Sequence, residues 1–153
     1  MERMEAGRTA PRFNLKDQHG NSVKLSDFSG RKLFVFFYPK ANTSGWATQA
    51  SNVRDVQNEL SKNNIAILGI SPDAPDTQKK FSDKQNLGYP LLSDPDHKTA
   101  DAFGAWGEKK LYGKTYMGII RSSFLIDEKG KILHAWYKIS PKNTVPELMK
   151  VLS

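Results

Sequence analysis

Residues 34–51 read FVFFYPKANTSGWATQAS and pass from one structural pattern into another. The apolar run that begins at Phe34 is unbroken, which is typical of a β-strand buried on both faces of a sheet. Pro39 and the Asn-Thr-Ser-Gly run after it end the strand and turn the chain. Beyond the turn, apolar residues at helical spacing indicate an amphipathic helix: Val53, Val56 and Leu60. The turn therefore leads into a helix N-terminus, where free backbone N–H groups and the helix dipole favour an anion.

The chain has the length and composition of one globular domain. It contains 153 residues, of which 38% are hydrophobic and 25% charged, and these values fit a domain with a sizeable core. No apolar run approaches the roughly 18 residues that a membrane-spanning helix needs. We therefore expect a single domain over residues 1–153. The polar N-terminus lacks the apolar core of a signal peptide, so we expect the cytoplasm as its location.

The formal net charge of +7 raises the question of a nucleic-acid partner. The lysines are scattered, however, and the pairs at 79–80 and 109–110 stand beside acidic or polar residues. No arginine-rich tract or standard nucleic-acid motif occurs. We interpret the charge as a solvated surface and expect no nucleic-acid or membrane partner.

Cysteine is absent, which excludes disulfides, thiolate metal sites and thiol catalysis in the chain as written. The three histidines, His19, His97 and His134, lack the spacing of metal ligands. The sequence also lacks a phosphate-binding loop and a dinucleotide glycine fingerprint. We therefore expect neither a metal nor a cofactor.

The remaining patterns predict an α/β domain. A strand pair around the turn at 17–21 comes first, and a second buried strand follows at 65–71. We then expect a helix capped by Asp76 or Thr77 and ending near Gln85, an extended piece at 89–94, and a short helix at 96–103 capped by Asp94 or Asp96. A surface loop follows at 104–118, and we interpret its Lys109, Lys110, Tyr112 and Tyr116 as part of a solvated loop rather than a basic-aromatic binding loop. The last elements are a strand at 119–126, its antiparallel partner at 131–137, and a helix capped by Thr144. The order predicts a central mixed β-sheet flanked by helices, which is the layout of a thioredoxin-like fold with an N-terminal β-hairpin extension.

Residues 37–51 resemble the active-site segment of the peroxiredoxins, closest to the bacterioferritin comigratory protein, or Q-type, subfamily. That segment runs Pro, three residues, Thr, two residues, Cys, and Pro39, Thr43 and position 46 match its spacing. Further similarity extends from about Gly7 to the C-terminus, notably at residues 54–55, 93–96, 106–110 and 112–121.

The resemblance implies a thiol peroxidase of antioxidant defence that reduces hydrogen peroxide and organic hydroperoxides. A cysteine thiolate attacks the peroxide O–O bond and becomes a sulfenic acid. A second thiol resolves the sulfenic acid to a disulfide, which thioredoxin or a similar dithiol reductant then reduces. Members of this subfamily are often monomers, and we expect a monomer here.

The resemblance also implies roles for individual residues. Arg121 would lower the pKa of a thiol at the helix N-terminus and hold the peroxide oxygens. The Thr43 hydroxyl would hydrogen-bond the peroxide, and the backbone N–H groups of Gly45 and position 46 would take up developing negative charge. Pro39 would shield the site from water, and Gln49 would brace the polar network.

The chain departs from the family at the reacting residues. Position 46, the peroxidatic position, is Trp46, which has no nucleophilic sulfur. The two candidate positions for the resolving thiol hold Ser51 and Ser82. The chain as written should therefore have no peroxidase activity.

Three explanations of Trp46 stay open: an engineered substitution, a selenocysteine codon read as Trp, and a natural homologue that has lost catalysis. A TGA codon at position 46 favours the second explanation, and TGG excludes it. The third explanation gives the alternative function, a non-catalytic binding or chaperone-like protein on the same scaffold. In each case we expect the bulky indole to displace or unwind the first helical turn, or to swing out toward solvent.

Overall fold

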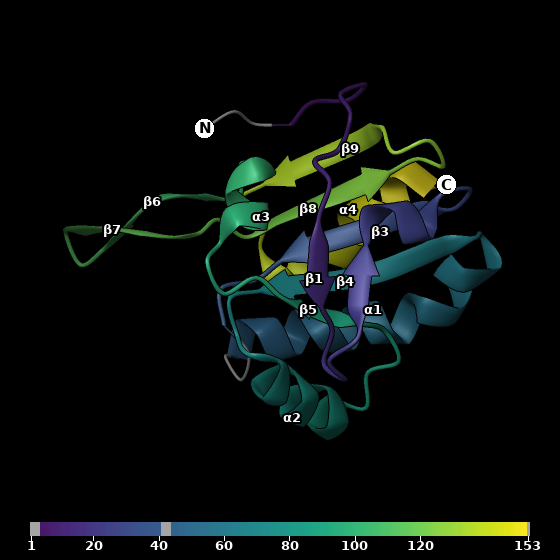
Figure 1. The fold of residues 1–153 in the computed structure, drawn as a ribbon. Coiled ribbons are helices and arrows are strands. Elements are labelled where there is room, and N and C mark those ends of the chain that lie inside the picture. The colour runs from purple at the N-terminus through teal and green to yellow at the C-terminus, as the bar shows by residue number, and fades with distance from the viewer. Residues whose placement is uncertain (1–3, 41–43, 153) are drawn as a thin grey trace.

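A seven-stranded mixed β-sheet forms the centre of the molecule (Figure 1). The computed structural model describes residues 4–40 and 44–152. In spatial order the strands are β2 (Ser22–Lys24), β1 (Asn14–Lys16), β5 (Leu91–Ser93), β4 (Ile65–Ser71), β3 (Lys32–Phe37), β8 (Ser122–Ile126) and β9 (Ile132–Tyr137). β3, β4 and β5 run parallel, whereas β1 and β8 pair antiparallel to this group. The predicted mixed sheet, the N-terminal hairpin and the β8–β9 hairpin are confirmed.

The apolar run of β3 divides its side chains between two cores. Leu33, Val35 and Phe37 enter one core, together with residues of the N-terminal segment and of α3 (Lys98–Ala102). Phe34, Phe36 and Tyr38 enter the other core, which α1 (Ser44–Lys62), α2 (Pro75–Gln85) and α4 (Thr144–Leu152) cover. A strand buried on both faces needs apolar residues at every position, which explains the unbroken run.

The predicted helix starts differ from the observed ones. α2 begins at Pro75, with Ala74 as its N-cap, so the prediction of Asp76 or Thr77 as the cap was wrong. The fixed φ of proline suits the first helical position and moves the start toward the N-terminus. α3 has His97 as its N-cap, yet the Asp94 carboxylate accepts the backbone N–H groups of its first turn, from Thr99 and Ala100.

The last helix also starts differently from the prediction. Thr144 is the first residue of α4, and its hydroxyl donates to the carbonyl of Ser140 at 3.2 Å. Short 3₁₀ helices complete the structure at Leu25–Phe28 and Pro141–Asn143. The second of these leads the chain directly into α4.

The prediction of a surface loop at 104–118 was wrong. β6 (Trp106–Leu111) and β7 (Lys114–Ile119) form a separate antiparallel ribbon, which projects from the body of the molecule in Figure 1. Tyr112 and Gly113 connect the strands, with φ values of 51° and 77°. Positive φ at both positions closes a two-residue hairpin turn whose twist matches the flanking strands.

Candidate active site

The end of β3 and the beginning of α1 place the predicted site at one end of the sheet. Pro39 follows β3 and is half-buried. α1 is helical from Ser44 onward, so the first turn at Trp46 is not unwound. The side chain of Trp46 and the whole of Thr43 lie outside the described residues, and the expectations for the indole and for the Thr43 hydroxyl stay predictions.

Three side chains from distant parts of the sequence form a hydrogen-bonded chain across this end of the molecule. Arg121 Nη1 donates to Gln49 Oε1 at 2.8 Å, and Gln49 Nε2 donates to Thr144 Oγ1 at 2.9 Å. Gln49 and Thr144 are buried. The guanidinium is only a donor, which fixes the orientation of the Gln49 amide. This series of hydrogen bonds therefore holds Arg121, α1 and α4 in one arrangement.

The guanidinium of Arg121 lies against the first turn of α1. A Cβ atom added to Gly45 would lie 3.5 Å from Arg121 Nη2 and 3.2 Å from Pro141 Cγ. A glycine thus permits the close approach of two other segments at the residue before position 46. Burial lowers the pKa of Arg121, but a guanidinium stays charged at neutral pH. The helix N-terminus therefore has a cation beside it.

A second cation, Lys109 of β6, belongs to the same surroundings. Its pKa is lowered, first by partial burial and second by the positive charge of Arg121. The Lys109 Cδ atom would lie 3.1 Å from a Cβ atom added to Gly118, so the aliphatic part of this side chain packs on the glycine of the facing strand. Arg121 is the cation placed against the first turn of α1, and Lys109 adds a second positive charge near Arg121, which suits a thiolate or another anion.

Sequence reasoning missed two contributors to this site: Pro141, and the side chain of Thr144 that bonds Gln49. Thr144 was predicted only as a helix cap. The local sequence around each carries no signal for the contact, because only the packing of α4 and of the turn before it brings them to α1.

The two candidate positions for a resolving thiol are not part of this cluster. Ser51 is half-buried on α1, five positions beyond Trp46. Ser82 is buried on α2 and accepts a hydrogen bond from Gln18 Nε2 at 3.4 Å. The Gln18 side chain also donates to the carbonyl of Tyr89 and accepts from the N–H of Leu91. Ser82 is therefore part of a buried hydrogen-bond network around Gln18.

A second buried network fixes the end of β3. The Tyr38 hydroxyl donates to Gln78 Oε1, and Gln78 Nε2 donates to Ser71 Oγ at 2.9 Å and to the carbonyl of Leu92 at 3.0 Å. Burial raises the pKa of Tyr38. The network ties β3, β4, β5 and α2 together just before the chain turns into the site.

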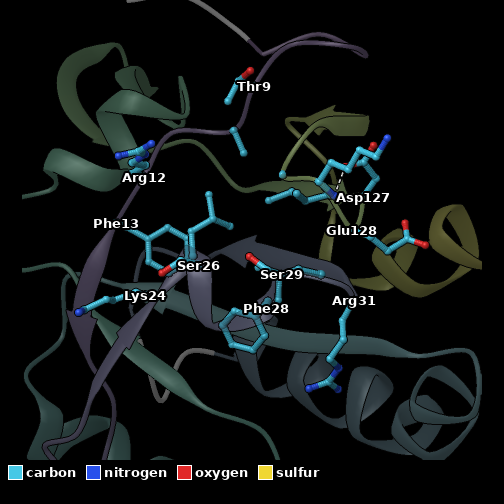
Figure 2. A pocket seen from close by; sticks show the side chains of 16 residues that line it. Thr9, Arg12, Phe13, Lys24, Ser26, Phe28, Ser29, Arg31, Asp127 and Glu128 are labelled. Carbon is cyan, nitrogen blue, oxygen red and sulfur yellow. Dashed lines mark hydrogen bonds between the residues drawn. The ribbon is translucent and has the colours of Figure 1, made fainter.

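A cavity of about 590 Å³ lies at the opposite end of the sheet (Figure 2). Its lining includes Arg31 and Leu33 at the start of β3, and Ile126 and Asp127 at the end of β8. None of the predicted site residues that the structure describes lines it. Among the described residues, no group of three or more His, Asp or Glu side chains is placed to hold a metal ion. No helix in the described part of the chain is both long and apolar enough to cross a membrane.

Comparison of the sequence with known proteins gives consistent matches. Residues 6–135 match the AhpC/TSA family. The chain is 48% identical over 143 residues to Peroxiredoxin Bcp of Escherichia coli (strain K12), a match that covers 94% of this chain and 92% of that protein. It is 43% identical over 149 residues to Peroxiredoxin Bcp of Bacillus subtilis, covering 97% and 95% of the two chains.

The fold is similar to solved structures of the same type. The Xanthomonas campestris bacterioferritin comigratory protein, studied for its alkyl peroxide reduction activity, superimposes with a TM-score of 0.86 at 33% identity. That match covers 92% of this chain and 89% of the other. A mutant of Xylella fastidiosa PrxQ superimposes with a TM-score of 0.92 at 29% identity, covering 99% and 97% of the two chains.

Proposed function

Because this chain belongs to the AhpC/TSA family as a relative of the Bcp peroxiredoxins, we propose that its scaffold is that of a thiol peroxidase whose reacting residue stands at position 46. The observation that carries the proposal is the contact of the Arg121 guanidinium with the first turn of α1. A thiol at that position meets a cation and a helix N-terminus, and both lower its pKa.

The reaction uses few groups of the chain. The thiolate attacks one peroxide oxygen and the O–O bond breaks, so the sulfur becomes a sulfenic acid. The other oxygen leaves as hydroxide or an alkoxide, which takes a proton from solvent to become water or an alcohol. Arg121 Nη1 is committed to Gln49, which leaves Nη2 to hold the thiolate and the peroxide oxygens. The backbone N–H groups of Gly45 and position 46 stabilise the leaving oxygen, Thr43 bonds the peroxide, and Pro39 limits the access of water.

The second half of the cycle returns the sulfur to the thiolate. We propose that a thiol at position 51 or 82 resolves the sulfenic acid in the thiol-bearing protein, and that thioredoxin or a similar dithiol reduces the resulting disulfide. We further propose that the protein works as a monomer in the cytoplasm, without a nucleic-acid or membrane partner.

The chain as written has no group that performs the first step. Trp46 supplies no sulfur, and the sequence contains no cysteine. An engineered substitution, a selenocysteine codon read as Trp and a natural loss of catalysis predict different genes. The codon for position 46 separates them in part, because TGA supports selenocysteine and TGG excludes it.

Restoring the thiol tests the proposed function. Peroxide consumption with dithiothreitol is measured for the chain as written, for the Trp46→Cys variant and for a matched Ser51→Cys variant that places a thiol on the same helix away from Arg121. We expect activity above background only with Trp46→Cys. A folded but inactive Trp46→Cys variant favours the alternative, a non-catalytic binding or chaperone-like protein, whose assay is suppression of the aggregation of an unfolded client protein.

A further inference from the structure

The β6–β7 ribbon carries the large hydrophobic side chains that the described surface leaves exposed. Tyr112 is 95% exposed, Tyr116 45% and Met117 51%. In Figure 1 the ribbon extends away from the sheet and the helices. Large apolar side chains exposed on one projecting element indicate a surface that another molecule contacts.

Tyr112 gives a second and independent indication. Its φ of 51° lies in the left-handed region, at the first position of the two-residue turn. Asn, Asp and Gly are the residues that suit this position, and an aromatic residue is disfavoured there. At 95% exposure the ring contributes no packing to the fold. A disfavoured residue that does not stabilise the fold points to a contact outside the chain.

The charge of the ribbon indicates the chemistry of the partner. Lys110 and Lys114 are exposed beside the turn, and the ribbon has one acidic residue, Glu108. In the strand register Tyr116 lies opposite Lys109, and Met117 lies opposite Glu108. The ribbon thus combines apolar side chains with an excess of positive charge, which fits a partner with an apolar patch bordered by carboxylates.

The base of the ribbon connects this surface to the proposed active site. β7 ends at Ile119, which is buried, and Arg121 follows two positions later. Arg121 lies against the first turn of α1, beside Gly45. A protein bound at the base of the ribbon therefore lies next to the first turn of α1.

We propose that the β6–β7 ribbon is the docking arm for an acidic, thioredoxin-type reductant, with Tyr112 as its anchor and Lys110 and Lys114 as partners for carboxylates. This inference rests on the proposed function. A second copy of the chain is disfavoured as the occupant because each copy carries a formal +7 and the same lysine-rich ribbon. Aromatic side chains are common anchors at protein interfaces, because they bury a large area with few rotatable bonds.

The chain as it exists suits a binding experiment, because without cysteine it cannot form a disulfide with the reductant. The isotope-labelled chain is titrated with a purified, reduced bacterial thioredoxin and followed by NMR. We expect shifts concentrated in the ribbon and an affinity that weakens with added salt. Tyr112→Asn should weaken binding by about tenfold or more while its melting temperature is unchanged or higher. Lys114→Glu should also weaken binding, and the matched control Lys129→Glu, in the turn between β8 and β9, should not.

Several outcomes overturn the proposal. Shifts that leave the ribbon unperturbed, no measurable binding, or equal affinities for the parent chain and Tyr112→Asn each do so. Sedimentation that shows self-association lost in Tyr112→Asn, with thioredoxin binding unchanged, assigns the ribbon to a second copy instead. Failure of the proposed function has a different readout, since it appears as absent dithiothreitol-driven peroxide consumption by Trp46→Cys, an assay that needs no docking.

Discussion

Arg121 brings a positive charge to the first turn of α1 from a distant part of the chain. Its Nη1 atom is held by the buried amide of Gln49, and its Nη2 atom lies beside Gly45. A fixed cation favours the ionised form of a neighbouring thiol, so it lowers the thiol pKa. In the described part of the chain a hydrogen bond, and no ion pair to a carboxylate, holds the guanidinium, so its positive charge is available to an anion.

Removing this charge should shift the pH dependence of a thiol introduced at position 46. In the Trp46→Cys background, Arg121→Met should raise the thiol pKa by about one unit or more, so alkylation by iodoacetamide moves to higher pH. The comparison is the matched change Arg31→Met, at the opposite end of the sheet, which should leave the profile in place. Identical profiles for the two methionine variants would contradict the role of Arg121.

The buried phenol of Tyr38, just after β3, should make the free energy of unfolding depend on pH. Burial raises its pKa above the value of about 10 that it has when unfolded. The folded state therefore holds the phenol proton more tightly than the unfolded chain, and stability declines as the pH rises above about 10. Tyr38→Phe should make the decline of urea-unfolding free energy above this pH shallower, although Tyr89, whose pKa is also raised by burial, contributes the rest. An unchanged slope would show that Tyr38 is solvated in solution.

At the scale of elements, Gln49 joins α1 to α4 and to the segment before β8. Gln49→Leu leaves Thr144 Oγ1 without its donor and the Arg121 guanidinium without its acceptor. A buried polar group that loses its hydrogen-bond partner lowers the free energy of unfolding by about 1–3 kcal/mol. We expect a loss of that size in urea unfolding. Gln57→Leu, which removes an exposed bond from the same helix to the carbonyl of Gly88, should cost about 0.5 kcal/mol or less. Equal losses would mean that the buried bonds add no stability.

The elements predicted from the sequence are those with a buried face. β3 and β4 have unbroken apolar runs, because both of their faces are buried. α1 has apolar residues at helical spacing, because one of its faces is buried. The ribbon of β6 and β7 has two largely exposed faces, hence no such period, and its Tyr-Gly turn replaces the usual Asn-Gly signal. The same limit applies to the site residues, because contacts made through tertiary packing leave no local pattern in the sequence. Pro39, Gln49 and Arg121 were predicted from the family resemblance, whereas Pro141 and Thr144 contact the site only through tertiary packing.

At the scale of the whole molecule, the sheet and the ribbon are stabilised differently. The sheet lies between two cores, to which β3 contributes Leu33, Val35 and Phe37 on one face and Phe34, Phe36 and Tyr38 on the other. The ribbon pairs only with itself and extends into solvent, apart from Trp106 and Ile119 at its base. The centre should therefore open only when the molecule unfolds, whereas the ribbon opens by itself.

This difference predicts two classes of amide hydrogen exchange. The amides of β3 and β4 should exchange with a free energy close to that of global unfolding, and those of residues 108–117 with much less. Adding a saturating partner for the ribbon should slow exchange in the second class alone, because binding stabilises only the state in which the ribbon is formed. Protection of residues 108–117 equal to that of β3, in the chain alone and at low concentration, would mean that the ribbon folds onto the body in solution. Tyr112 would then be covered by its own chain and unable to anchor a partner.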